Sequence, residues 1–352
     1  MSRTAPPGFL NLVRHGFVRV AVGAPFVRPA DPAFNGGRLS AMARRAAEAG
    51  ASLLLTPELG LSAYAIDDLL HQSALLDGAE AALGRLAAET AALPLALVVG
   101  APLRVAGRVH NAGLVLHRGR ILGAVPKSYL PNYREFYEAR HFAPAAEAAA
   151  DRATVAGQDV PFGVDLLFDA EDLPGFTLAL EVCEDVWTPI PPSARAAMAG
   201  ATVVANLSAS NATVGKSDYR HALCRTTSAR QLCAYLYSAA GRGESTTDLA
   251  WDGHAMIYED GDLLAEAPRF SDAEEMIVAD LDLDRLAAER ARMGPFSACA
   301  RDNPPDRPFR RIGFSLDPAR DRDLGLIRPL ARFPFVPADP ARLDALCAEA
   351  YE

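Results

Sequence analysis

Short apolar segments and Ala-rich amphipathic segments alternate along the first hundred residues, and this order restricts the possible folds more than any other feature. Residues 17–22, 52–55 and 95–100 are apolar runs with the length of β-strands. Residues 38–49 and 78–90 place apolar side chains at helical spacing. The order strand, helix, strand, helix, strand predicts a layered α/β fold around a largely buried sheet.

Two hairpin patterns later in the chain add antiparallel strands to this plan. Residues 111–125 contain two β-type runs separated by H-R-G-R, and residues 255–265 contain two runs around an Asp-Gly pair. Between the hairpins we expect three strands and one helix, at 177–182, 201–207, 234–238 and 216–231. Parallel units combined with hairpins predict two mixed sheets sandwiched between helices.

The pattern weakens toward the C-terminus. We expect one last strand at 276–282, followed by a charged helix that ends near Arg292. Residues 294–340 are rich in Pro, Arg and Asp, which predicts an extended tail or a flexible linker. Residues 341–351 return to helical spacing, and because this pattern stops without a C-cap we expect the natural polypeptide to continue.

Charge and cysteine usage exclude several classes of protein. Acidic residues outnumber basic ones, 44 to 35, and the net charge of −9 argues against a nucleic-acid-binding surface. No apolar run approaches the ~18–20 residues that span a bilayer, and no apolar core of a signal peptide is found. The five cysteines include no C-x-x-C pair, so we expect neither a disulfide framework nor a zinc site. This composition predicts a globular protein of the cytoplasm.

Lysine occurs only at positions 127 and 216, because Arg supplies every other basic side chain. This bias is typical of a GC-rich coding sequence. Where an exposed cation is usually Arg, a retained Lys suggests a position that needs a compact ammonium group. Chance retention of two lysines is the alternative.

Three residues with catalytic chemistry follow apolar strand-type segments. Glu58 follows L-L-L-T-P, Lys127 follows a hairpin strand in A-V-P-K-S-Y-L, and Cys183 ends the run T-L-A-L-E-V-C. A desolvated carboxylate can act as a general base, an ammonium group can hold an oxyanion, and a cysteine at a strand-to-turn junction is a candidate nucleophile. Each residue alone also fits a structural role, as a turn acid, a surface lysine or a buried core cysteine.

Base, cation and nucleophile at three strand ends form a group suited to acyl transfer. No histidine stands in a comparable position, since His110 and His117 flank a hairpin strand. Glu–Lys–Cys chemistry is therefore favoured over Cys–His chemistry. The remaining cysteines are interpreted as structural: Cys224, Cys233, Cys299 and Cys347.

Three segments resemble the nitrilase (carbon–nitrogen hydrolase) superfamily in order and spacing: T-P-E, P-K-S-Y-L-P-N-Y-R-E-F-Y-E and C-E-D-V-W. Within this superfamily, the segments more closely resemble the glutaminase domains of glutamine-dependent NAD synthetases. Residues 59–69, 206–216 and 241–253 support this resemblance, and the last segment, G-R-G-E-S-T-T-D-L-A-W-D-G, is highly specific. Residues 332–337, R-F-P-F-V-P, and the helical pattern after them resemble the linker toward the synthetase half.

The resemblance implies a four-layer αββα sandwich and hydrolysis of L-glutamine to glutamate and ammonia. It assigns a Glu–Lys–Cys triad to Glu58, Lys127 and Cys183, and a supporting acid to Glu138. It implies no cofactor and no metal for this reaction. The positions expected to contact glutamine or to line its pocket are Tyr64, Tyr133, Glu184, Trp187, Ser210 and Lys216.

In this family the ammonia passes to a synthetase domain that amidates deamido-NAD with ATP and Mg²⁺. That domain carries an S-G-G-x-D-S loop, which does not occur in this sequence. We therefore expect a glutaminase domain at residues 1–293, a linker at residues 294–352 and no NAD synthesis by this chain alone. We also expect a homo-oligomer.

Two other functions fit the sequence. The first is a stand-alone amidase of the same superfamily that acts on another amide, and the specific segment 241–253 argues against it. The second is an assembly module with little activity in isolation, because its site loops would lack the contacts that a partner domain supplies.

Overall fold

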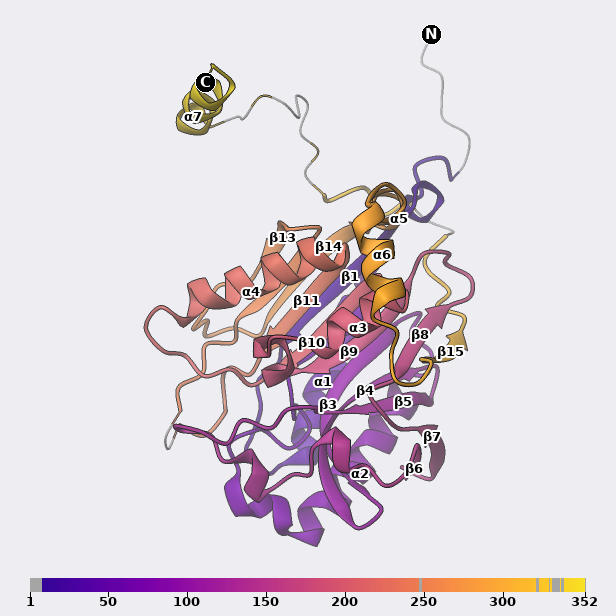
Figure 1. Cartoon of the computed structure of the whole chain (residues 1–352). Coiled ribbons are helices and arrows are strands. Elements are labelled where there is room, and N and C mark those ends of the chain that lie inside the picture. Colours follow the sequence, from indigo (N-terminus) through magenta and orange to yellow (C-terminus); the bar gives the residue numbers. More distant parts are fainter. Residues whose placement is uncertain are drawn as a thin grey trace.

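The chain folds into two large β-sheets that pack against each other, with helices on the outer faces (Figure 1). A third, small sheet has two strands. The computed structural model describes residues 8–246, 249–320, 323–328, 330, 336 and 339–351.

The first sheet has six strands in the order β14-β1-β2-β3-β4-β5. The strands β1, β2 and β3 run parallel, and the other neighbours are antiparallel. Their bounds are Phe17–Ala24 (β1), Leu53–Leu55 (β2), Ala96–Val105 (β3), Arg108–His117 (β4), Arg120–Pro126 (β5) and Glu275–Asp282 (β14).

The second sheet has seven strands in the order β13-β12-β11-β10-β9-β8-β15. The strands β9, β10 and β11 run parallel at its centre. Their bounds are Leu166–Ala170 (β8), Thr177–Val182 (β9), Val203–Ser208 (β10), Ala234–Ala239 (β11), Ala255–Glu259 (β12), Asp262–Glu266 (β13) and Arg310–Phe314 (β15). The small sheet pairs Arg152–Val155 (β6) with Gln158–Pro161 (β7).

Helices and short 3-10 turns connect the strands. The α-helices are Pro32–Glu48 (α1), Ser73–Glu89 (α2), Pro192–Met198 (α3), Lys216–Gln231 (α4), Leu283–Arg292 (α5), Gly294–Asp302 (α6) and Pro340–Tyr351 (α7). The 3-10 turns are Leu12–His15 (η1), Asp67–His71 (η2), Glu138–Arg140 (η3), Ala145–Glu147 (η4) and Cys183–Trp187 (η5). In the described part of the chain, no helix is long and apolar enough to cross a membrane.

Alternation of side chains along the strands explains the layers. Val20 and Leu53 belong to the core cluster between the two sheets, together with Leu207 of β10. Their neighbours point to the opposite face, where Leu54 packs in a second cluster with Leu39 of α1. Because both faces of the first sheet are buried at its centre, β2 is apolar throughout and β3 is apolar over residues 96–101. The expected αββα sandwich is confirmed (Figure 1).

The elements with the clearest sequence patterns match their predictions. β9 and α4 have the predicted bounds, 177–182 and 216–231. α1 begins before the predicted residue 38, because the Asp31 side chain caps the helix by accepting a hydrogen bond from the Phe34 N–H. Two glycines in the first turns of α1 weaken the helical pattern there, so the early start is not visible in the sequence.

The C-terminal tail contains more regular structure than the sequence predicts. α6 lies within the segment predicted to be extended, and β15 extends the second sheet by pairing in parallel with β8. Arg310 of β15 forms an ion pair with Asp165 at 2.6 Å, and Phe314 is buried in the core between the sheets. The arginines of β15 obscure this strand in the sequence, since they lower its apolar content.

Other predictions for the tail have mixed outcomes. The predicted helix at 341–351 is confirmed by α7, which has no buried residue. The segment R-F-P-F-V-P at 332–337 lies outside the described residues except for Val336. The domain boundary at residue 293 stays a prediction.

Candidate active site

The ends of three strands bring Glu58, Lys127 and Cys183 into one region from both sheets. Glu58 follows β2 after a short turn, while Lys127 and Cys183 directly follow β5 and β9. β2 and β5 belong to the first sheet, and β9 belongs to the second. The Glu58 backbone N–H donates to the Ser208 carbonyl at 3.3 Å, which joins its loop to β10 of the second sheet. The packing of the sheets therefore determines how these side chains meet.

Lys127 lies between two carboxylates. Its Nζ is 2.7 Å from Glu58 Oε1 and 2.7 Å from Glu138 Oε1, and its side chain is fully buried. Burial by itself lowers the pKa of Lys127, but the negative charges of Glu138 and Glu58 raise this pKa well above its usual value. Lys127 is therefore a permanent cation inside the protein.

Glu58 uses only one of its carboxylate oxygens for protein contacts. Its Oε1 accepts hydrogen bonds from Lys127 Nζ and, at 2.6 Å, from Asn111 Nδ2. Its Oε2 is buried and has no hydrogen-bond partner among the described residues. This oxygen is therefore available to accept a hydrogen bond from a bound molecule.

Cys183 occupies a sharp turn at the end of β9. Its backbone φ is 47°, in the left-handed region, and the residue is only 6% exposed. Burial and the negative charge of Glu58 raise the pKa of the Cys183 thiol well above its usual value, although Lys127 opposes this shift. The resting side chain is therefore a neutral thiol, which needs a base before it can act as a nucleophile.

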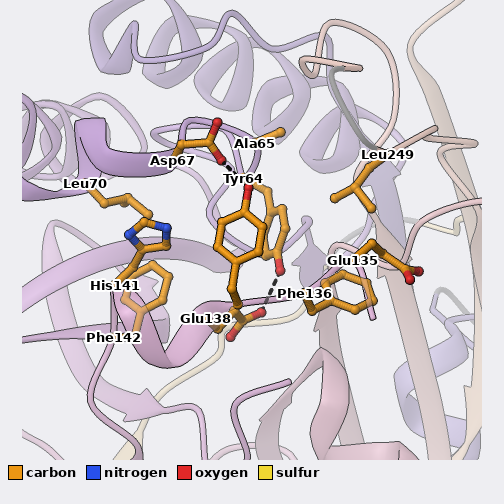
Figure 2. Close-up of a pocket in the computed structure, with 11 residues that line it drawn as sticks. Tyr64, Ala65, Asp67, Leu70, Glu135, Phe136, Glu138, His141, Phe142 and Leu249 are labelled. Carbon is orange, nitrogen blue, oxygen red and sulfur yellow. Dashed lines mark hydrogen bonds between the residues drawn. The ribbon is translucent and has the colours of Figure 1, made fainter. Parts of the chain in front are cut away.

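Glu138 and Tyr64 complete the buried cluster. The Tyr64 hydroxyl donates to Glu138 Oε1 at 2.7 Å, and Figure 2 shows the two side chains pointing toward each other. Burial raises the pKa of Glu138 to about 7. The positive charge of Lys127 opposes this shift, and the negative charge of Glu58 adds to it. Glu138, the predicted supporting acid, thus contacts the ammonium of Lys127 directly. Tyr64, a predicted pocket residue, is linked to this ammonium through its hydrogen bond to Glu138.

Asp185 joins the segments that carry Lys127 and Cys183. Its carboxylate accepts hydrogen bonds from the N–H groups of Val182 at 2.9 Å, Ser128 at 3.1 Å and Tyr129 at 3.0 Å. The first donor precedes Cys183, and the other two follow Lys127. The sequence analysis missed this role, although Asp185 lies inside the C-E-D-V-W motif.

Glu244 supports the opposite side of the cluster. Its carboxylate accepts hydrogen bonds from the N–H groups of Tyr64 and Ala65, at distances from 2.9 to 3.1 Å. Burial raises the pKa of Glu244 to about 7. This role was also missed, and the available signal was an acid within the specific segment G-R-G-E-S.

The predicted glutamine-contacting residues come from several segments, including η5, which begins with Cys183, and the start of α4. The Tyr133 hydroxyl donates to Glu184 Oε1 at 2.8 Å, and Tyr133 is about half exposed. The ammonium of Lys216 donates to Asn211 Oδ1 and lies 5.3 Å from the centre of the Trp187 ring. No salt bridge in the described part of the chain involves Lys216. Burial lowers the pKa of its ammonium group. Lys216 is therefore a partly buried cation that feels the charges of Glu135 and Glu184 but makes no salt bridge among the described residues.

The Ser210 hydroxyl also has a hydrogen-bond partner within the protein. Ser210 Oγ accepts a hydrogen bond from Arg220 Nε at 3.1 Å. Arg220 is itself buried and forms a salt bridge with Asp252 at 2.6 Å. Arg220 was not singled out in the sequence, where it is one of many arginines.

A pocket of about 490 Å³, including its open mouth, approaches the cluster from the side of Tyr64 and Glu138 (Figure 2). Cys183 and Lys216 do not line it. The residues that line it are Tyr64, Ala65, Asp67, Leu70, Glu135, Phe136, Tyr137, Glu138, His141, Phe142 and Leu249.

Two packed mixed sheets thus carry a buried cysteine, glutamate and lysine at their strand ends. This arrangement is consistent with a hydrolase that acts through a cysteine nucleophile. The family model for carbon–nitrogen hydrolases matches residues 19–291, and the chain belongs to this family. Among structures of the same fold is the C145A mutant of the amidase from Nesterenkonia sp. AN1 in complex with butyramide. Its TM-score is 0.60, and the two chains are 23% identical over 80% of this chain and 97% of that one.

Relatives within the family are more specific. The chain is 53% identical over 344 residues to the glutamine-dependent NAD(+) synthetase of Mycobacterium tuberculosis. The matched region covers 97% of this chain and 50% of that protein. The Mycobacterium leprae protein of the same name is 48% identical with the same coverage. A crystal structure of a glutamine-dependent NAD(+) synthetase from Cytophaga hutchinsonii has a TM-score of 0.67 and 27% identity, over 75% of this chain and 43% of that one. The chain thus spans about half the length of the curated relatives it matches.

Proposed function

We propose that this chain is a glutamine amidohydrolase that releases ammonia and glutamate from L-glutamine. Its similarity to glutamine-dependent NAD(+) synthetases over 97% of its length supports glutamine as the substrate. The observation that carries the mechanism is the unpaired Oε2 of Glu58, a buried base whose charge acts on Cys183. Glu58, Lys127 and Cys183 form the proposed triad.

The first half of the reaction forms a thioester. Glu58 Oε2 takes the thiol proton while Cys183 Sγ attacks the side-chain amide carbon of glutamine. Lys127 and the backbone N–H of Glu184 stabilise the oxyanion, and one such donor typically contributes about 3–4 kcal/mol. The C–N bond then breaks as Glu58 returns its proton to the departing ammonia, leaving a γ-glutamyl thioester.

The second half regenerates the enzyme. Glu58 takes a proton from a water molecule, whose oxygen attacks the thioester carbon. The C–S bond breaks, glutamate leaves, and Cys183 regains its proton. Glu138 holds Lys127 throughout and is not a proton carrier in this scheme.

Recognition of glutamine rests on the surrounding loops. The ammonium of Lys216 pairs with the α-carboxylate, because no carboxylate of the described residues lies within salt-bridge distance of it. Glu184, with its partner Tyr133, offers a carboxylate for the α-ammonium group. Ser210 and Trp187 form further walls of the substrate site.

We further propose that the ammonia serves a synthetase domain that amidates deamido-NAD, the role that the names of the relatives indicate. ATP and Mg²⁺ belong to that second reaction. The glutaminase chemistry derived above uses only side chains and backbone groups of this chain. A cytoplasmic homo-oligomer remains our expectation for the assembly.

The first prediction concerns the nucleophile. Cys183→Ala should abolish glutamate release from glutamine, and Cys299→Ala, an exposed cysteine, should not reduce it. A γ-diazoketone analogue of glutamine should alkylate wild-type Cys183, detected by mass spectrometry, even if turnover is slow. Hydrolysis of simple amides as fast as glutamine would instead support a stand-alone amidase, and glutamate release by Cys183→Ala would contradict the mechanism.

A further inference from the structure

Two histidines and an aspartate meet beside the pocket, outside the residues assigned to the reaction. Asp68 and His71 belong to η2, and His141 directly follows η3. One ligand atom from each residue lies within 4.8 Å of the other two. We propose that Asp68, His71 and His141 form a binding site for a divalent metal ion of the Zn²⁺ type.

The distance between the imidazole rings supports a shared ion. His141 Nδ1 and His71 Nε2 are 3.4 Å apart. A hydrogen bond donated by nitrogen is normally about 2.7–3.2 Å long. Two imidazole nitrogens bound to one tetrahedral Zn²⁺ at about 2.0–2.1 Å lie about 3.3–3.4 Å from each other. The observed separation therefore fits two ligands of one metal ion better than it fits a hydrogen bond.

Asp68 lies at the edge of the same group. Its Oδ1 is 3.9 Å from His141 Nδ1, and it offers a carboxylate oxygen within 4.8 Å of a ligand atom of each histidine. A carboxylate oxygen and two imidazole nitrogens form a donor set that Zn²⁺ accepts in proteins.

Arg140 limits the affinity of this site. Its Nε and Nη2 donate to the two carboxylate oxygens of Asp68, each at 2.7 Å. A bound cation would share Asp68 with the guanidinium and would be repelled by its positive charge. Removal of Arg140 should therefore tighten metal binding, which is an effect that a purely structural role of these residues does not predict.

A second group of similar composition serves as a comparison. His254 Nε2 and His221 Nε2 are 3.0 and 3.1 Å from the same oxygen of Glu266. His221 Nδ1 pairs with the Tyr258 hydroxyl at 2.7 Å, and His254 Nδ1 faces Arg220. Because every ring nitrogen here already has a partner, a metal ion would have to break existing hydrogen bonds.

The site has a defined position relative to the buried cluster. η2 follows the segment that carries Tyr64, and His141 follows the turn that begins with Glu138. His141 also lines the pocket (Figure 2). A metal ion at this site would therefore link the two segments that hold the Tyr64–Glu138 hydrogen bond.

The test is calorimetric titration of the untagged full chain with Zn²⁺. We expect one ion per chain in the wild type, binding weakened by at least about tenfold in His71→Ala, and tighter binding in Arg140→Ala. His221→Ala is the matched control and should bind like the wild type. His71 and Arg140 are exposed, so their alanine variants should fold, which circular dichroism checks.

Three outcomes would overturn the proposal. They are the absence of Zn²⁺ binding in both the wild type and Arg140→Ala, unchanged affinity in His71→Ala, and loss of binding in His221→Ala. Unchanged affinity in His71→Ala would assign the ion to cysteine thiols or other surface groups. None of these results depends on glutaminase activity, so the proposal is judged separately from the proposed function.

Discussion

Lys127 and Lys216 are chemically similar but lie in opposite electrostatic surroundings. Lys127 contacts two carboxylates inside the protein, whereas Lys216 has no salt bridge within the described residues. The first therefore holds a permanent charge in the catalytic cluster, and the second offers its charge to a ligand. The scarcity of lysine in the sequence indicated both positions, but only their contacts distinguish the two roles.

A substitution at Lys216 tests the second role. Lys216→Met keeps the aliphatic stem near Trp187 and removes the charge. Loss of one charge-assisted contact should raise the KM for glutamine about 10–100-fold, with a smaller effect on kcat. Arg225→Met, an exposed residue of the same helix, is the matched control. A KM for glutamine that stays unchanged in Lys216→Met would remove Lys216 from the substrate site.

Among the elements, β3 determines where the loop with Glu58 can lie. Gly100 of β3 faces this loop, and the backbone atoms of the loop leave no room for a side chain at this position. An added Cβ would overlap the backbone nitrogen of Leu59 and lie 2.8 Å from the Pro57 carbonyl oxygen. The absence of a Cβ at one strand position thus permits the close approach of the catalytic loop.

Gly100→Ala should therefore damage both stability and activity. Because the conflict is with backbone atoms, we expect a loss of about 1–3 kcal/mol in the free energy of unfolding and a reduced rate of glutamate release. Gly37→Ala in α1 is the matched control, since an added Cβ there meets no atom within 4 Å. The free energy of unfolding of that variant should rise by up to about 1 kcal/mol. Urea unfolding measures both changes, and equal behaviour of the two variants would disprove this account.

Buried carboxyl groups make the stability of the whole molecule depend on pH. Burial raises the pKa of Glu138 and of Glu244 to about 7, from an ordinary value of 4.5. Between these values the folded state binds more protons than the unfolded state, so by linkage the protein loses stability as pH rises toward about 7. His254, whose burial lowers its pKa to about 4, acts in the opposite direction below its ordinary value of 6.5. The net fall in stability should therefore be clearest just above pH 6.5.

Urea unfolding across this pH range tests the prediction. The free energy of unfolding of the wild type should fall between about pH 6.5 and 8. Glu244→Gln, which cannot ionise, should reduce this slope, while Glu147→Gln on the surface should leave it unchanged. A wild-type stability that rises over the same interval would contradict the assigned protonation of the buried acids.

The sequence by itself determined the main elements and the candidate residues. β9 and α4 were predicted at their observed bounds because alternation and helical spacing are local properties of the chain. Weak or interrupted patterns concealed the start of α1 and the edge strand β15. The family resemblance supplied the candidate roles of Glu58, Lys127 and Cys183, which stay predictions until they are tested.

Only the tertiary structure decided which side chains meet. The carboxylates of Asp185 and Glu244 hold backbone segments that are distant in the sequence, and no local pattern encodes such contacts. His71 and His141 are brought together in the same way, by two turns beside one pocket. The physical reason is that periodicity records which face of an element is buried, whereas hydrogen bonds and electrostatic contacts depend on how the sheets and loops pack.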